Sequence, residues 1–197
     1  MRSADSALRP ILYACASFAL LLASCAVRPD HFYTLDTLPD AARGAAVPLT
    51  THVMLNVTVP SLVDRRQMVI NASRDQVLIL EHERWAGSLA EQVSQTLARD
   101  IERRRSDVLV GDRGFDQAGA VPVKIKVDIV QMSAQKGGRA TIEAHWRIVD
   151  ASAKVDEIGG DIFSAPLDGE EYSAVARGFS ECLSSLADRL VEKLPAH

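Results

Sequence analysis

Cysteine is scarce in this sequence, which has three in 197 residues, at positions 15, 25 and 182. Cys15 lies inside an N-terminal apolar segment, Cys25 directly follows it in a context that favours lipidation, and Cys182 stands alone. An exported protein could form disulfides, but one remaining thiol excludes an intrachain disulfide in the mature chain. The fold is therefore expected to depend on an apolar core alone.

The N-terminal apolar run, residues 11–23, is too short for a transmembrane helix, which needs about 18–20 residues. Arg2 and Arg9 precede it, and the small residues Ala23 and Ser24 end it. A charged start, an apolar middle and small residues before a cleavage site indicate a secretory signal. Its last four residues, Leu22-Ala23-Ser24-Cys25, match the lipobox of bacterial lipoproteins. This predicts cleavage between Ser24 and Cys25. An ordinary signal followed by a chance cysteine is the alternative.

Lipidation would leave a soluble domain tethered to a membrane surface. A lipobox implies a diacylglyceryl group on Cys25 and usually an amide-linked acyl chain, and two or more chains make anchoring stable. No other cofactor is expected. Ala26 follows the cysteine, where an aspartate would be the familiar signal for retention at the inner membrane. By similarity to enterobacterial sorting, this favours the periplasmic face of the outer membrane.

An excess of positive charge is also missing. The net charge is −4, and removing residues 1–24 takes away Arg2, Arg9 and Asp5, so the mature chain is near −5. A mildly acidic protein has no electrostatic reason to bind nucleic acid. With 47% hydrophobic residues the chain is typical of a globular protein. We expect a signal peptide at 1–24, a lipid-anchored leader at 25–51 and one domain at 52–197.

Several segments have the composition of strands. Two short apolar runs, 67–72 and 76–80, flank Ser73-Arg74-Asp75 and predict a hairpin. Phe32-Tyr33-Thr34-Leu35 in the leader is either a short strand docked on the domain edge or a loop with a stray aromatic pair. Alternating apolar and polar residues predict strands at 52–59, 121–129 and 142–148. A short buried strand is expected at 107–111, and a further strand at 155–164. The last of these is expected to complete an antiparallel meander, with a β-bulge at Gly159-Gly160.

Two segments repeat apolar residues at helical spacing. In the first, Ser88 and Glu91 can form a capping box at its start, with a start nearer Trp85 as the alternative. Arg103-Arg104-Arg105 suit the negative end of the helix dipole. Its apolar stripe is Leu89, Val93, Leu97 and Ile101, with Ala86, Ala90 and Ala98 on the same side. In the second, Asp168 can cap the helix with Glu171, and the stripe is Tyr172, Val175, Phe179, Leu183, Leu186 and Leu190. The predicted fold is α+β, a mainly antiparallel or mixed sheet with two amphipathic helices on one face.

Motifs of catalysis are missing. The sequence has no nucleophile elbow, no phosphate-binding glycine loop and no zinc-helix histidine pair. Glu81-His82-Glu83 is the densest ligand-like cluster, but neighbours on an extended chain point to opposite faces, which disfavours a metal site. Cys182 falls near a helical stripe and is interpreted as a packed thiol. The arginine run 103–105 is interpreted as cations that stabilise the C-terminal end of the helix dipole. A nucleic-acid-binding patch is the alternative. We expect a protein that is not an enzyme.

Two stretches resemble a known family. Residues 59–69, VPSLVDRRQMV, are similar to its pattern of a proline, a Tyr-Leu-Asp-Arg run and an apolar strand; they differ at Leu62, where tyrosine is common, and at Arg66, where proline is common. Residues 83–89, ERWAGSL, are similar to the tryptophan-led start of its first helix. With the lipobox and the strand-prone leader, they resemble the PqiC-like ABC-type transport auxiliary lipoproteins.

The resemblance implies a subunit of an intermembrane lipid transport system. Its partners would be an MCE-domain, PqiB-like protein, the transporter subunits and further copies of itself in a homo-oligomeric ring. Asp64 and Arg65 either pair within their loop or meet a neighbouring subunit. Trp85, a further candidate interface residue, is expected to pack under the sheet edge, with contact to lipid as the alternative. Two other functions stay open: a structural or regulatory lipoprotein that activates a cell-wall or other envelope complex, and an envelope hydrolase, for which no nucleophile-base pair can be named.

Overall fold

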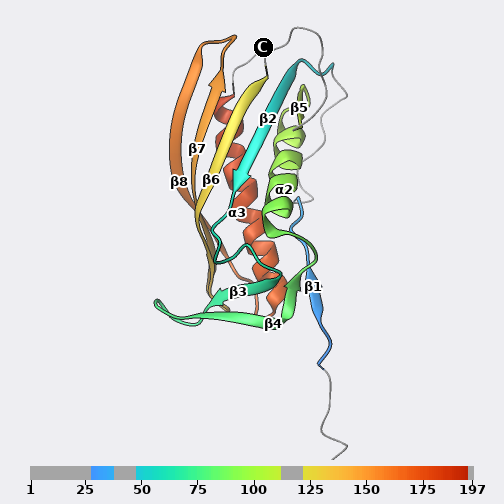
Figure 1. Cartoon of the computed structure of the whole chain (residues 1–197), viewed down its shortest axis with the longest axis vertical. Coiled ribbons are helices and arrows are strands. Elements are labelled where there is room, and N and C mark those ends of the chain that lie inside the picture. The colour runs from blue at the N-terminus through green and yellow to red at the C-terminus, as the bar shows by residue number, and fades with distance from the viewer. Residues whose placement is uncertain (1–27, 38–47, 112–121, 195–197) are drawn as a thin grey trace, which may run out of the picture. The chain divides into compact units, whose positions relative to one another are not determined.

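A mixed five-stranded sheet is the largest element of the computed structural model, which describes residues 28–37, 48–111 and 122–194. Its strand order is β5-β2-β6-β7-β8, with bounds Val108–Val110, Thr51–Thr58, Val123–Ala134, Arg139–Asp150 and Val155–Pro166 (Figure 1). β6, β7 and β8 form the predicted antiparallel meander, whereas β2 lies parallel to both of its neighbours. β6 is longer than the predicted strand 121–129, and Val121 lies outside the described residues.

Two helices cover one face of this sheet, which confirms the predicted α+β fold. α2 (Leu89–Arg104) contacts β2 and β5, and α3 (Tyr172–Lys193) contacts β7, β8 and α2 (Figure 1). The predicted stripes are buried against the inward residues of the sheet, except that Tyr172 is only partly buried. Within the described chain we find no helix with the length and apolar character needed to cross a bilayer.

The alanines expected beside the α2 stripe do not fill the core. Ala86 is exposed, and Ala90 and Ala98 are half-buried. Thr96 and Asp100 occupy the buried positions instead. The reason is that α2 faces α3 as well as the sheet, so its buried surface extends toward the line of residues that meets the second helix.

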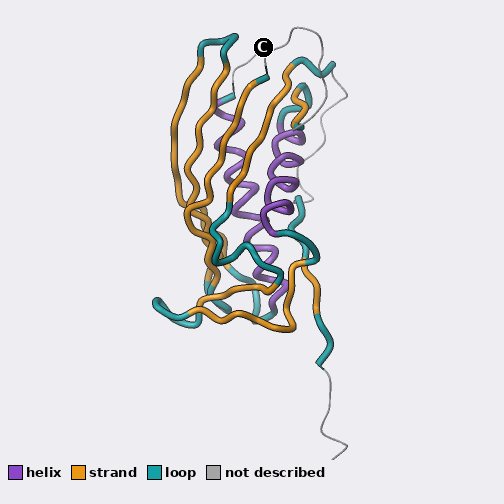
Figure 2. Tube along the Cα trace, in the orientation of Figure 1, coloured by secondary structure: helices purple, strands orange, loops and turns teal. Residues whose placement is uncertain are grey.

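A second sheet, of three strands, lies at one end of the first (Figure 2). It has the order β1-β4-β3, with bounds His31–Tyr33, Val77–Trp85 and Gln67–Asn71. β3 and β4 are the predicted hairpin, and β1 is the predicted leader strand, paired parallel to the end of β4. The sequence pattern led us to expect one sheet, and the structure has two.

The bulge expected at Gly159-Gly160 is wrong, because β7 and β8 pair without a register shift along their whole length. Each glycine instead lies under an aromatic ring of the residue paired with it. A Cβ on Gly159 would lie 2.5 Å from Trp146 Cε2, and one on Gly160 would lie 2.6 Å from His145 Cδ2. The glycines are therefore needed for close approach of two rings. The register shift in this sheet lies elsewhere, in β6 between Ile129 and Gln131.

The two helix starts differ from each other. The Ser88 cap is confirmed, since its hydroxyl oxygen accepts a hydrogen bond of 3.3 Å from the Glu91 N–H. The Asp168 cap is wrong, because α3 begins after Glu171, whose side chain makes no capping hydrogen bond. Gly169, with φ of +102°, separates Asp168 from the helix, so the carboxylate is too far back in the chain to cap it.

The arginine run at the end of α2 forms structural ion pairs. Arg104 forms an ion pair with Asp188 of α3 through its Nε, and its Nη2 donates to Ser184 Oγ at 2.7 Å. Arg105 pairs with Asp107 at 2.8 Å, and this hydrogen bond lowers the pKa of the Asp107 carboxyl. These contacts add to the helix-dipole interpretation, because two of the three arginines hold α2 to neighbouring segments.

Candidate functional site

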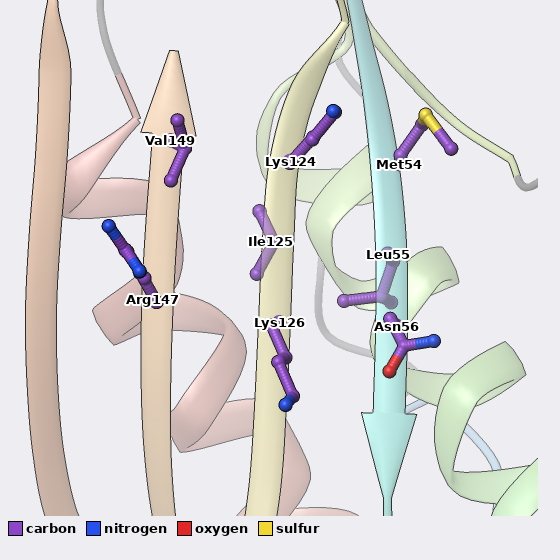
Figure 3. A pocket seen from close by; sticks show the side chains of 8 residues that line it. All are labelled: Met54, Leu55, Asn56, Lys124, Ile125, Lys126, Arg147 and Val149. Carbon is purple, nitrogen blue, oxygen red and sulfur yellow. The ribbon is translucent and has the colours of Figure 1, made fainter.

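The face of the five-stranded sheet opposite the helices carries a shallow cavity of about 300 Å³. Figure 3 shows the residues that line it, which come from β2, β6 and β7: Met54, Leu55, Asn56, Lys124, Ile125, Lys126, Arg147 and Val149. We call this region the outer-face site. It joins apolar surface from Met54 and Val149 to three cationic side chains.

Strand register brings the cations together. Side chains two residues apart on a strand point to the same face, so Lys124 and Lys126 of β6 both lie on the outer face. Lys126 pairs with Arg147 of β7 on one side and with Asn56 of β2 on the other. The inward partners of this alternation, such as Ile125, are buried beneath the helices. Burial of the inward set therefore forces the cations outward.

The three cations differ in their electrostatic environment. Arg147 forms a two-point pair with Asp156 of β8, with an Nη2–Oδ2 distance of 2.6 Å. This hydrogen bond and charge raise the pKa of Arg147 and lower the pKa of Asp156. Lys124 and Lys126 form no ion pair with another described residue. Two ammonium groups beside an apolar patch can therefore bind carboxylate or other acidic groups of a partner surface.

The residues that the sequence proposed as sites lie elsewhere. Ser24 and Cys25 are outside the described residues. Asp64 and Arg65 lie in the loop between β2 and β3, where the Asp64 N–H donates to the Pro60 carbonyl at 3.1 Å. No ion pair joins Asp64 to Arg65, and the Arg65 Nε is buried without a hydrogen-bond partner among the described residues. The structure therefore shows no Asp64–Arg65 ion pair within the loop.

Trp85 ends β4 and is 2% exposed. Its ring centroid lies 6.4 Å from that of Phe179 on α3, and its backbone N–H donates to the Arg66 carbonyl at 2.7 Å. The indole packs inside the core, and the backbone bond brings the two motif stretches, 59–69 and 83–89, side by side. Because Trp85 is buried, a substitution there would affect an interface only by moving the loop that contains Arg66.

Glu83, from the cluster considered for a metal, binds β1 instead. Its carboxylate accepts from Tyr33 Oη at 2.6 Å, and its Oε1 lies 3.1 Å from His31 Nδ1. Burial and this hydrogen bond raise the pKa of Tyr33 well above its ordinary value. In the described parts of the chain, no group of three or more histidine, cysteine or acidic side chains is arranged to hold a metal ion.

Cys182 is a packed thiol. It is buried on α3, with its Sγ 3.5 Å from the Phe163 carbonyl oxygen, and burial raises its pKa to about 11. At neutral pH such a thiol is protonated and shielded from solvent. The interpretation made from its place near the helical stripe is therefore confirmed in position and in chemistry.

Comparison with known proteins settles the family. The sequence matches the model of the ABC-type transport auxiliary lipoprotein component over residues 33–191. The chain belongs to this family. A search of curated proteins finds no match for this auxiliary lipoprotein. The resemblance drawn from the two motif stretches is confirmed.

Two solved structures share the fold of this auxiliary lipoprotein. One is an uncharacterized protein with a TM-score of 0.71 and 13% identity, covering 85% of this chain and all of that one. The other is protein XCC0632 from Xanthomonas campestris, with a TM-score of 0.60 and 15% identity, covering 82% and 91% of the two chains. At these identities the likeness concerns the fold alone.

Sequence reasoning missed the outer-face site of this auxiliary lipoprotein. The alternation predicted at 121–129 does place Lys124 and Lys126 on the same face of one strand. It could not indicate that Arg147 and Met54 lie beside them, because those contacts depend on strand register and on the parallel placement of β2. The only available signal was the pair of lysines two residues apart.

Proposed function

We propose that this protein is an outer-membrane-anchored periplasmic subunit of an MCE-type intermembrane lipid transport system. Its role is to dock and assemble partners without catalysis, in support of membrane integrity. The observation that carries the proposal is the family match over residues 33–191, preceded in the same chain by the lipobox Leu22–Cys25. Ala26 after the cysteine supports outer-membrane placement. Self-association into a ring is part of the proposal and rests on the family resemblance.

The outer-face site is our candidate for the surface that binds the MCE-type partner. No described element covers it, and its two lysines carry no counter-ion among the described residues. A partner with acidic groups beside apolar side chains would complement both of its features. The opposite face of the sheet is occupied by α2 and α3 and is closed to a partner.

Replacing Cys25 with serine is expected to release the protein from the membrane. Without acyl chains, the only stable attachment in the proposal is lost. We expect the wild type to sediment with outer membranes and the Cys25→Ser variant to appear in other fractions, when envelope fractions are compared by immunoblot. Cys182→Ser is the matched control, because that thiol is buried and should leave the distribution unchanged. Retention of Cys25→Ser in outer membranes would contradict the anchor.

Reversing the charge of Lys126 is expected to weaken partner binding about tenfold or more, since a like charge at a complementary interface is strongly unfavourable. The measurement is the yield of the MCE-type partner that co-purifies with the tagged lipoprotein from detergent-solubilised envelopes. Lys154→Glu, at the exposed β7–β8 turn, changes the net charge equally and should leave the yield unchanged. An unchanged yield with Lys126→Glu would rule out this face, and absence of any transport partner with the wild type would count against the whole proposal.

A further inference from the structure

Exposed apolar side chains gather on the three-stranded sheet and the loop that leads into it. Among the described residues, half of the ten exposed large hydrophobic side chains are found there: Phe32, Leu62, Val77, Leu78 and Ile79. Three of these are consecutive in β4, with exposed fractions of 38%, 43% and 41%. We call residues 71–79, the turn of the hairpin and the start of β4, the hairpin arm.

Both faces of the arm are partly open to solvent. Successive side chains of a strand point to opposite faces, so exposure of three in a row leaves both faces open. One edge of the arm is open as well, because β1 pairs only with Glu83–Trp85, at the far end of β4. By contrast, Met68, Val69 and Ile70 on the opposing strand β3 are buried. The arm thus offers an apolar surface that the rest of the domain does not use.

Chain length limits how far the arm can be from the anchor. This step rests on the proposed lipidation of Cys25. His31 lies six residue steps after Cys25, and even fully extended these steps span about 20 Å at most. His31 pairs with Glu83, and the four residues back to Ile79 add about 13 Å along the strand. Phe32, the next residue after this entry point, is itself exposed. The bilayer surface is therefore within reach of the arm.

We propose that the hairpin arm inserts into the interfacial layer of the membrane that holds the acyl chains of Cys25. Val77, Leu78 and Ile79 enter the boundary between headgroups and acyl chains, while Arg74 and Asp75 at the turn stay among the headgroups. A protein partner on the open edge of β4 is the competing occupant. The bilayer is favoured because the tether limits its distance from the arm, whereas the arm has no charge pattern that selects a protein. The arm would make the tethered domain hold one orientation on the membrane.

The test uses the full mature lipoprotein in vesicles of phosphatidylcholine and phosphatidylglycerol. A cysteine at position 78 (Leu78→Cys) carries an environment-sensitive fluorophore, and a label at Ile158→Cys is the control, since Ile158 is 74% exposed on β8. The buried Cys182 is protected from the reagent. We expect the label at 78 to shift to shorter wavelength and to lose fluorescence when the lipids carry brominated acyl chains, and the label at 158 to do neither. Ile79→Asp should abolish this quenching, and Ile162→Asp should not.

Two results would overturn the inference alone. One is a label at 78 that is quenched by aqueous iodide and unaffected by brominated lipid. The other is a label shielded in native envelopes but open to iodide in vesicles, which would assign the arm to a protein partner. Lipidation and membrane attachment are measured separately, by the mass of the N-terminal peptide and by vesicle flotation. A protein that neither floats nor carries lipid would overturn the proposed function, and the inference with it.

Discussion

Replacing Arg104 with leucine is expected to lower the free energy of unfolding by about 3–5 kcal/mol, because it leaves the Asp100 carboxylate buried without its counter-ion. Asp100 is 1% exposed, and Arg104 Nη1 lies 3.4 Å from its Oδ1. Arg104 also connects α2 to α3 through Ser184 and Asp188. Denaturant unfolding of the purified protein measures the loss, and in a thermal scan it corresponds to a lower Tm by about 10 °C.

The double variant Asp100→Asn/Arg104→Leu is the matched control. Removing both charges should recover much of the loss, since a neutral amide costs less to bury than an unpaired carboxylate. If the double variant is no more stable than Arg104→Leu, the unpaired charge is not the cause of the loss.

The same pair of variants predicts a pH dependence with a defined sign. Burial raises the pKa of Asp100 above the ordinary carboxyl value of 3.8, although Arg104 opposes this. A raised pKa in the folded state means that protonation favours folding. The loss of folding stability caused by burying the Asp100 carboxylate is therefore absent below the ordinary pKa of 3.8 and grows as the pH rises through the folded-state pKa. We expect the stability gap between Arg104→Leu and the double variant to be widest at neutral pH and to narrow as the pH falls. A gap independent of pH would contradict this explanation.

Replacing Trp85 with alanine is expected to cost about 3–5 kcal/mol of stability, in the range found for buried tryptophan. The indole is 2% exposed and lies against Phe179, so it joins the three-stranded sheet to α3. Its removal leaves a cavity at the junction of two elements that have few other contacts. Because domains are only marginally stable, this loss is large enough to lower the amount of folded protein in cells. Denaturant unfolding of the purified protein is again the measurement.

The Trp85→Phe variant separates packing from an interface role. Phenylalanine keeps an aromatic ring in the core, so we expect a smaller loss of stability and normal yield of the transport partner. A variant of full stability that fails to retain the partner would show that Trp85 acts at an interface. The loop that contains Asp64 and Arg65 would then be the place to look, since the Arg66 carbonyl accepts from the Trp85 N–H.

Local patterns predicted most secondary-structure elements correctly. The β3–β4 hairpin follows from two apolar runs around a polar turn, and the α2 start follows from the hydroxyl of Ser88. Two of the failures have a common origin in neighbours that are distant in sequence. Gly159 and Gly160 were interpreted through backbone conformation, but the rings of Trp146 and His145 require them, and those rings belong to another strand. The buried positions Thr96 and Asp100 depend on the place of α3.

The sequence by itself determined the family, the α+β class, the periodicity of the elements and the predicted anchor at Cys25. Each of these can be predicted from short stretches of chain, because a period of 2 or 3.6 residues or a four-residue motif is enough to identify it. Only the tertiary structure decided that there are two sheets, that β2 lies parallel between β5 and β6, and that Met54, Lys126 and Arg147 share one surface. The physical reason is that pairing between strands distant in sequence is selected by burial of the whole core, and no local pattern encodes that choice.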